Sequence, residues 1–339
     1  MKRETVLVVC PGRGTYNAPE LGYLKRHHAG RRDLIEAFDA VRTARGEEAL
    51  SAADGAAAFD PAHHLRGEVA TPLIYASGIL DFLSIDRMRF EIVAVTGNSM
   101  GWYTALACAG AVSPVDGFAI AAAMGTNSQK HGPGGQLLLT LVNEDWHLDL
   151  ALRAKVEALM PRFGIARSIE LGGMLVVAGA PDDLLAFEAA LPAMQTRAPL
   201  HLPGHGPFHT ALMAASSAAA HVELSPSLVG QPAIPLVDGR GGIWRRFETD
   251  PAALHEYTFS GQILTPYDFT AAIDVGLKEF APDRIVLVGP GDTLGGAIGQ
   301  ALVAARWSGI VDKASFATRQ ERDPFLVAMG KPAQRALIV

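Results

Sequence analysis

The chain has 339 residues, of which 49% are apolar and 19% are charged. This length allows one large domain or two closely packed ones with a sizeable core. The 29 basic and 35 acidic residues give a net charge of −6, which argues against a nucleic-acid-binding protein. The 35 glycines and 21 prolines favour tight turns and an active site built from loops.

The sequence contains no signal for export, a metal ion or a membrane span. Its two cysteines, Cys10 and Cys108, cannot build a disulfide framework, and neither lies in a CxxC or Cys/His motif. The apolar run at 5–10 is too short for a signal segment, and no stretch reaches the roughly 18 apolar residues of a membrane span. We therefore expect a cytoplasmic protein without a bound metal.

Strand and helix patterns alternate in the first part of the chain. The apolar run at 5–10 predicts a parallel strand buried on both faces, and 91–95 predicts another. Helical spacing covers 34–44 and 71–84, with Pro72 near the first turn of the second helix. Further features are an irregular, polar segment at 46–70 and a helix at 102–109 that Gly110 should end.

The pattern changes from Gly134 onward and then returns to that of the first part. Strands are expected at 134–142, 168–171, 174–178 and 198–202, and helices at 148–160 and 181–191. Their order is βαββαβ, that of a ferredoxin-like unit. The later elements are a helix through Ala220, strands near 234–237 and at 284–288, and a helix near 267–280.

These patterns predict an α/β fold with an insertion. Residues 1–132 and 203–310 would form a core with a parallel sheet, and residues 133–202 would form a ferredoxin-like small subdomain. Residues 311–339 are mixed and charged, and we set them apart as a C-terminal tail.

The segment Gly97-Asn98-Ser99-Met100-Gly101 matches G-x-S-x-G between an expected strand and an expected helix, where a nucleophile elbow belongs. The glycines allow a turn too sharp for side chains, and the helix directs N–H groups at a developing oxyanion. The Met100 N–H is the natural donor. The match alone also fits an ordinary glycine-flanked turn, but its context favours a serine nucleophile.

A serine nucleophile needs a base, which is usually histidine. Of the 11 histidines, His205 and His209 stand out in LPGHGPFHTALM. This loop returns to the core after the insertion, and its glycines and proline would let it fold tightly over the site. Spacing alone does not choose between the two histidines.

GNSMGWYTALACAGAVS resembles the GHSxGEYSALxAAGxLS block of malonyl-CoA:acyl carrier protein transacylases and of the acyltransferase domains of polyketide and fatty acid synthases. PGRGTYN resembles the family's PGQGSQ, GPFHTALM its VPSHCALM, GQILTPYDF its EQLxNPVRW, and LVGPGDTLGG its EVGPGxxLxG. The five blocks span most of the chain in the family's order. The resemblance implies a hydrolase-like α/β core with a ferredoxin-like small subdomain.

Matched position by position, the resemblance implies a role for each site residue. Ser99 would be the nucleophile, His209 its base, and the main-chain carbonyl of Gln262 would orient the imidazole. The N–H groups of Met100 and Arg13 would form the oxyanion hole. The resemblance also implies acyl-CoA as substrate, the phosphopantetheine of an acyl carrier protein as acceptor, and no permanently bound cofactor.

The sequence departs from the family where acyl selectivity is set. Malonyl-selective members carry an arginine that binds the free carboxylate, and Met124 stands at that position in IAAAMGTNSQ. Asn98 replaces the histidine before the nucleophile and Trp102 the glutamate after the motif. We expect Asn98, Trp102 and Met124 to line a changed substrate pocket.

Two interpretations of the pocket follow. In the preferred one, Met124 opens an apolar pocket for an uncharged acyl group. In the other, Arg13 reaches across the site and supplies the missing guanidinium, so that malonyl or a similar acid is still bound.

The preferred function is an acyl-CoA:acyl carrier protein S-acyltransferase that works through a Ser99 ester. The alternative is a hydrolase in which water replaces the carrier thiol and clears acyl groups from a carrier. A non-catalytic scaffold is disfavoured, because the serine, histidine and glutamine are all retained. Carrier docking is expected on basic patches such as Arg240 with Arg245 and Arg246.

Overall fold

The computed structural model describes residues 2–194 and 196–339. Met1, the first residue of the expected core, and Gln195, inside the expected subdomain, lie outside the described residues. The larger sheet has the strand order β11-β10-β1-β2-β7-β8. Its strands are β1 (Glu4–Cys10), β2 (Phe90–Gly97), β7 (Leu236–Val237), β8 (Ile243–Trp244), β10 (Arg284–Leu287) and β11 (Leu326–Ala328). Neighbouring strands are parallel except β7 and β8.

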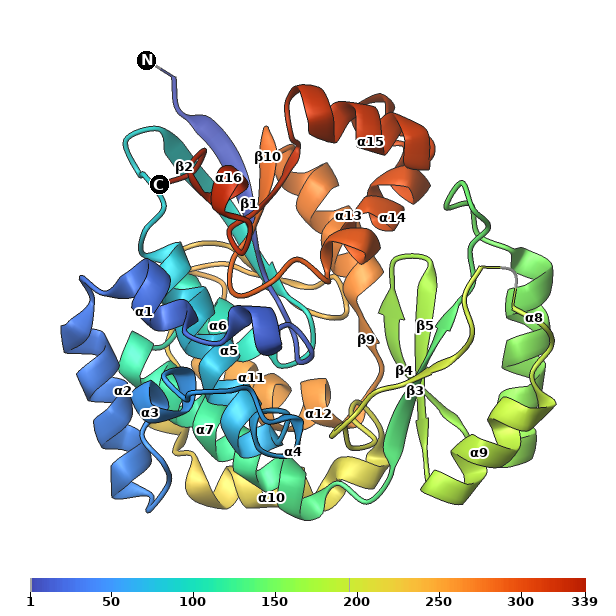
Figure 1. The fold of residues 1–339 in the computed structure, drawn as a ribbon, viewed down its shortest axis with the longest axis horizontal. Helices are drawn as coiled ribbons and strands as arrows, with labels where there is room; N and C mark the ends of the chain where they lie inside the picture. Colours follow the sequence, from blue (N-terminus) through green and yellow to red (C-terminus); the bar gives the residue numbers. More distant parts are fainter. Residues whose placement is uncertain (1, 195) are drawn as a thin grey trace.

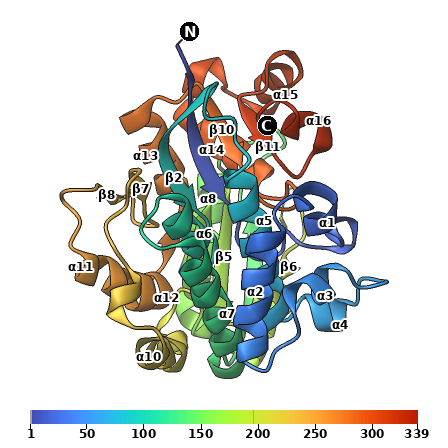
Figure 2. The same cartoon turned by 90° about the vertical axis from the view of Figure 1, so that its left-hand side faces the viewer.

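Strand β1 is buried on both faces, which explains its unbroken apolar sequence. Val6 and Val8 face one apolar cluster, whereas Leu7 and Val9 face another. Helices cover both faces of the sheet (Figure 2): α5 (Gly67–Phe82), α6 (Gly101–Cys108) and α7 (Pro114–His131) on one, and α13 (Phe269–Phe280) and α14 (Gly295–Ala305) on the other. The predicted α/β fold with a parallel sheet is confirmed.

A second sheet stands beside the first (Figure 1), with the strand order β6-β3-β5-β4-β9. Its strands are β3 (Gly135–Thr140), β4 (Ala166–Leu171), β5 (Met174–Gly179), β6 (Leu200–His201) and β9 (Tyr267–Asp268). Helices α8 (Leu150–Leu159) and α9 (Pro181–Ala190) pack on one face through Val156, Leu175 and Phe187. On the other face, Val176 joins the cluster around α13 and α14. The two sheets are therefore packed together.

The remaining helices surround the larger sheet. They are α1 (Tyr23–His28), α2 (Arg32–Ala44), α3 (Leu50–Asp54), α4 (Pro61–His64), α10 (Ala214–Glu223), α11 (Pro251–Glu256), α12 (Gln262–Leu264), α15 (Lys313–Arg322) and α16 (Pro332–Arg335). In residues 2–194 and 196–339, no helix has the length and apolar character needed to cross a membrane.

Two local predictions were wrong around Pro72. The segment 46–70 holds α3, α4 and the start of α5, and Pro72 lies inside α5 rather than in its first turn. A proline cannot donate to the carbonyl four residues earlier. That carbonyl, of Glu68, accepts a hydrogen bond from Arg42 Nη1 at 2.6 Å, so the helix tolerates the proline.

Two segments also cross the expected domain boundaries. Tyr267 and Asp268, expected at the start of a helix, form β9 and pair in parallel with β4, so the core contributes a strand to the smaller sheet. The C-terminal segment 311–339 is not a separate tail, because its strand β11 pairs in parallel with β10. A strand of three residues is too short to produce a recognisable alternation in the sequence.

Candidate functional site

The turn between β2 and α6 places Ser99 at the end of a central strand. Ser99 has a φ of 55°, in the left-handed region that non-glycine residues rarely adopt. A Cβ on Gly97 would lie 2.4 Å from the carbonyl of Gly101, and one on Gly101 would lie 2.2 Å from the oxygen of Cys10. Both positions therefore require glycine, as expected for a nucleophile elbow.

His209 is the histidine that contacts the serine. Its Nε2 lies 2.8 Å from Ser99 Oγ, and its Nδ1 lies 2.6 Å from the main-chain oxygen of Gln262. A carbonyl oxygen only accepts, so Nδ1 carries the proton and Nε2 accepts from the Ser99 hydroxyl. This tautomer is the one that can take the proton of the serine.

The environment of His209 keeps the imidazole neutral. Burial lowers the pKa of His209 from 6.5 to about 4, and the hydrogen bond to the Gln262 carbonyl raises it only in part. The imidazole is therefore unprotonated at neutral pH and available as a base.

Gln262 contacts the nucleophile turn as well as the histidine. Its Nε2 donates to the Ser99 carbonyl at 2.9 Å, and the residue directly follows a π-helical turn, Tyr257–Gly261. Such turns occur often at functional sites. Here the turn delivers both the side chain and the carbonyl of Gln262 to the site.

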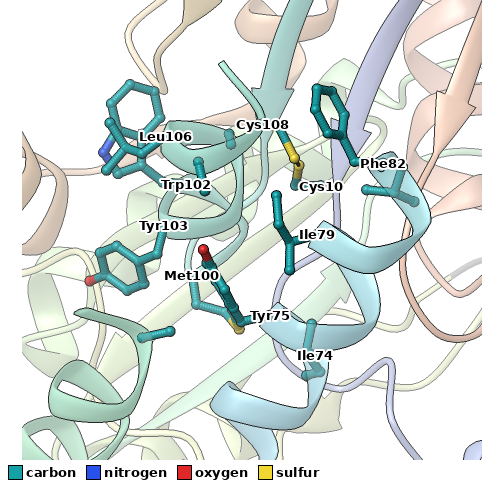
Figure 3. Close-up of a cluster of buried hydrophobic side chains, with 14 of the residues drawn as sticks. Cys10, Ile74, Tyr75, Ile79, Phe82, Met100, Trp102, Tyr103, Leu106 and Cys108 are labelled. Atoms are coloured by element: carbon teal, nitrogen blue, oxygen red, sulfur yellow. Dashed lines mark hydrogen bonds between the residues drawn. The ribbon is translucent and has the colours of Figure 1, made fainter. Parts of the chain in front are cut away.

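Trp102 supports this π-helical turn and lines neither of the two spaces that Ser99 lines, so its expected place in the substrate pocket was wrong. Its Nε1 donates to Thr258 Oγ1 at 3.0 Å, and its ring meets that of Tyr257 edge to face at 5.1 Å. Figure 3 shows Trp102 on the side of α6 opposite Ile79 of α5. The side chain is fully buried, because the turn carrying Thr258 covers this side of α6.

The two expected oxyanion donors line the same pocket as Ser99. Met100 directly precedes α6, and Arg13 lies in the loop after β1. That loop is pressed against the elbow, because a Cβ on Gly12 would lie 2.8 Å from the Asn98 oxygen. Over the described residues, the main-chain N–H groups of Arg13 and Met100 have no hydrogen-bond acceptor.

Two connected spaces open at Ser99. An inner pocket of about 50 Å³ is lined by Arg13, Met124, Phe208 and Ser216 together with Ser99. A larger cleft of about 930 Å³ runs from Ser99 between the two sheets. Met124 thus reaches the site as expected.

Asn98 and His205 line the larger cleft. The Oδ1 of Asn98 has no partner among the described residues. His205 Nδ1 lies 2.8 Å from Gln136 Oε1, and Gln136 Nε2 donates to Ser168 Oγ at 2.7 Å. Ser168 donates in turn to the Phe208 carbonyl at 2.8 Å, which ties the histidine loop to the smaller sheet. Nothing in the sequence signals Gln136 or Ser168, because they meet only through this packing.

Arg13 also contributes its side chain to the site. Its Nη2 donates to the Leu65 carbonyl at 2.6 Å, and its guanidinium lies 5.8 Å from the centre of the Phe208 ring. Burial lowers the pKa of Arg13 to about 10, which leaves it charged at neutral pH.

The expected basic patch of Arg240, Arg245 and Arg246 stays a prediction, and the structure gives the surroundings of its first two residues. Arg240 Nη2 pairs with Asp238 Oδ2 at 2.6 Å, and its guanidinium lies 4.1 Å from the centre of the Tyr257 ring. Arg240 is therefore held next to the π-helical turn, while Arg245 lies 4.0 Å from Glu248. Within residues 2–194 and 196–339, no group of three or more His, Cys, Asp or Glu side chains is placed to hold a metal ion.

No protein-family model matches the chain. Malonyl CoA-acyl carrier protein transacylase of Salmonella typhimurium is 26% identical over 204 residues, which cover 60% of this chain and 63% of that protein. The corresponding Escherichia coli protein is also 26% identical over 204 residues, with the same coverage. The chain thus matches less than two thirds of the length of these curated relatives.

Solved structures extend the similarity over nearly the whole chain. The malonyl-CoA:acyl carrier protein transacylase of Xanthomonas oryzae has a TM-score of 0.75 at 21% identity and covers 99% of this chain and 98% of its own. A malonyl-transacylase in complex with a type II polyketide synthase acyl carrier protein has a TM-score of 0.72 at 17% identity and covers 98% and 97%. The expected resemblance is confirmed, and at these identities the structural neighbours establish the fold.

Proposed function

We propose that the chain is an acyl-CoA:acyl carrier protein S-acyltransferase that works through an ester of Ser99. The observation that carries this proposal is the continuous hydrogen-bonded path from Ser99 Oγ through His209 to the Gln262 carbonyl, at 2.8 and 2.6 Å. Its curated relatives are acyltransferases, and one structural neighbour is in complex with an acyl carrier protein.

In the first half-reaction, Ser99 Oγ attacks the thioester carbonyl while His209 Nε2 takes the serine proton. The negative charge on the tetrahedral oxygen is stabilised by the N–H groups of Met100 and Arg13 and by the N-terminal end of α6. Collapse breaks the C–S bond, and the CoA sulfur leaves with the proton from His209. The acyl group is then an ester of Ser99.

In the second half-reaction, the phosphopantetheine thiol of the carrier protein enters through the larger cleft. His209 takes the thiol proton, and the thiolate attacks the ester carbonyl. Collapse releases Ser99, which recovers the proton from His209, and the acyl group leaves on the carrier. No resident cofactor is needed for either step.

The fold supports this proposal in finer detail. The strand order β6-β3-β5-β4, with antiparallel neighbours and two helices on one face, supports a ferredoxin-like subdomain. The strand–Ser99–helix turn at the end of a parallel strand supports a hydrolase-like core. We retain 133–202 as the subdomain, with β9 added from the core. The cytoplasmic location stays a prediction.

The inner pocket beside Ser99, of about 50 Å³, favours a short acyl group over a long one. Met124 lines this pocket and carries no charge. We therefore propose an acyl preference that differs from that of enzymes with arginine at this position.

The hydrolase alternative uses the same Ser99 ester but is not favoured, because the matched curated relatives are transacylases. Intact-mass measurement distinguishes the two. The protein is incubated with acetyl-, malonyl- and octanoyl-CoA, and then with a holo acyl carrier protein. We expect a Ser99 adduct that persists until the carrier is added and then moves to the carrier. Adduct loss without carrier would establish the hydrolase, and adduct formation in Ser99→Ala would exclude the proposed nucleophile.

A further inference from the structure

His209 holds a backbone conformation that its neighbours must stabilise. Its φ of 59° lies in the left-handed region, which is strained for a residue with a side chain. Its imidazole is hydrogen-bonded at both nitrogens, to Ser99 Oγ and to the Gln262 carbonyl, so a change in this backbone would move the base away from the serine. The peptide that enters His209 carries the carbonyl of Phe208. A group that holds this carbonyl therefore helps to fix the imidazole.

Ser168 is the side chain that holds the Phe208 carbonyl. Its Oγ lies 2.8 Å from that oxygen, and no main-chain N–H in the described part of the chain donates to it. Ser168 has no exposed surface and lines neither of the two spaces at Ser99. Ser168 therefore does not touch a substrate held in either space.

The direction of the Ser168 side chain depends on a bulge in β4. The register of β4 against β5 shifts between Arg167 and Ile169, which leaves Ser168 as an extra residue without a partner on β5. Consecutive residues of a regular strand point to opposite faces, whereas a bulge redirects a side chain and occurs often beside active sites. Ile169 lines the larger cleft, and the bulge turns Ser168 to the same side, toward Gln136.

The hydrogen bonds around Ser168 form a chain with a single direction. The Phe208 carbonyl only accepts, so Ser168 uses its one hydroxyl proton there. Ser168 Oγ then accepts from Gln136 Nε2 at 2.7 Å, which turns Gln136 Oε1 toward His205 Nδ1 at 2.8 Å. His205 Nδ1 therefore donates, and burial lowers the pKa of this ring, which keeps it neutral. Each side chain from the cleft wall to Phe208 is thus oriented by the one before it.

We propose that Ser168 is a positioning residue for His209, and that Gln136 and His205 orient its hydroxyl from the wall of the larger cleft. The bulge in the smaller sheet then keeps the base aligned on Ser99, in addition to the contact that Gln262 makes from the larger sheet's side. This inference rests on the proposed function, because it concerns the activation of the same serine.

Ser168→Ala tests the inference, with Ser77→Ala as the matched control. Ser77 is equally buried, and its Oγ donates to a carbonyl at the same 2.8 Å, but that carbonyl, of Leu73, belongs to its own helix α5. With acetyl- or malonyl-CoA under single-turnover conditions, Ser168→Ala should lower the maximal rate of Ser99 acylation about tenfold or more. The acyl-CoA concentration that gives half of this rate should stay unchanged, because Ser168 does not reach the substrate. Ser77→Ala should leave both values as in the wild type.

A fluorophosphonate gives a second measurement that needs no thioester. Its reaction forms the bond from Ser99 Oγ to phosphorus and breaks the P–F bond, so that fluoride leaves while His209 takes the serine proton. The rate should fall about tenfold in Ser168→Ala and also in Gln136→Leu. The double variant should add little, because Gln136 acts through Ser168.

The outcomes separate the inference from the proposed function. Wild-type phosphonylation in Ser168→Ala would overturn the inference, and so would equal losses in Ser168→Ala and Ser77→Ala or a raised half-maximal concentration at an unchanged maximal rate. Each of these leaves the proposed function intact. Absence of Ser99 acylation with every thioester would refute that function, whereas slower phosphonylation in Ser168→Ala would still support the positioning role.

Discussion

Gln262 is bonded to the main chain of Ser99 by its side-chain amide, whose Nε2 donates to the Ser99 carbonyl at 2.9 Å. Its own carbonyl oxygen lies 2.6 Å from His209 Nδ1. One residue therefore fixes both the strained turn that carries the nucleophile and the ring that accepts its proton. A displacement of the π-helical turn would move the two catalytic groups together.

Gln262→Ala separates these two contacts, because it keeps the main-chain carbonyl and removes the amide. We expect a loss of about 1–2 kcal/mol in the free energy of unfolding, since one buried hydrogen bond disappears. Acylation of Ser99 should slow roughly 10- to 100-fold, because small misplacements of reacting groups are costly. Denaturant unfolding and single-turnover acylation measure the two effects.

Gln320→Ala is the control for this variant. The side-chain amide of Gln320 accepts a hydrogen bond from the N–H of Leu326 and donates one to its carbonyl, at the edge of the larger sheet. Its loss should destabilise the chain similarly without slowing acylation. Equal slowing in the two variants would show that the Gln262 amide has no positioning role.

The lowered pKa of His209 predicts the pH dependence of activity. Because burial lowers this pKa from 6.5 to about 4, the imidazole stays unprotonated far below neutral pH. The acylation rate should therefore be nearly constant from pH 8 to about pH 5 and fall only as the pH approaches 4. A pH–rate profile with a midpoint near 6.5 would contradict the buried, neutral base.

The same shift predicts a stability effect. Between pH 6.5 and about 4, His209 binds a proton in the unfolded chain but not in the folded one, so stability falls as the pH falls through this window. The contribution of this one group reaches roughly 3 kcal/mol at the lower end. Unfolding of wild type and His209→Ala across this range measures it, and the variant should show a smaller decline.

Gly101 is the position where an added methyl group should do most damage. Its Cβ would lie 2.2 Å from the Cys10 oxygen, which is main chain and cannot move aside cheaply. Gly101→Ala should therefore cost more than about 4 kcal/mol and abolish acylation. Gly30→Ala is the control, because a Cβ there meets nothing within 4 Å. Its thermal midpoint should match that of the wild type.

Trp102→Phe tests whether this residue positions the π-helical turn or binds substrate. The variant removes the Nε1 donor to Thr258 and should cost about 1–2 kcal/mol of stability. Since Trp102 lines neither pocket, kcat should fall and KM for acyl-CoA should stay unchanged. A rise in KM with constant kcat would indicate that Trp102 contacts the substrate after all. Thr258→Val should reproduce the effect, and the double variant should add little.

The sequence predicted the elements that carry strong local signals. Strand β1 has an apolar run, and the elbow at Ser99 has glycines that its geometry demands. The choice of His209 over His205 needed the family resemblance, because both lie in one loop and only the folded chain brings one of them to Ser99.

Features made by contacts between distant segments escaped prediction. Trp102 stands two residues after the motif, yet its surroundings come from Thr258. Strand β9 is two residues long and exists only because β4 lies beside it. The unpaired state of Ser216 depends on packing of α10, which no spacing in the sequence reveals.

The C-terminal segment should be required for stability, because it completes a buried cluster of charges around Asp81. Arg335 Nη1 and His28 Nε2 lie 2.5 and 2.9 Å from Asp81 Oδ1, and Tyr23 donates its hydroxyl to Oδ2 at 2.8 Å. Removing one partner leaves a buried carboxylate poorly compensated, so Arg335→Met should cost about 3–5 kcal/mol.

The exposed Arg322 provides the control within the same segment. Arg322→Met removes the same charge from a side chain in no ion pair among the described residues, and it should change stability by less than about 0.5 kcal/mol. Denaturant unfolding compares the two variants. Equal effects would show that Arg335 acts only through net charge, whereas the expected difference identifies the segment after β11 as part of the core, held by Asp81 of α5.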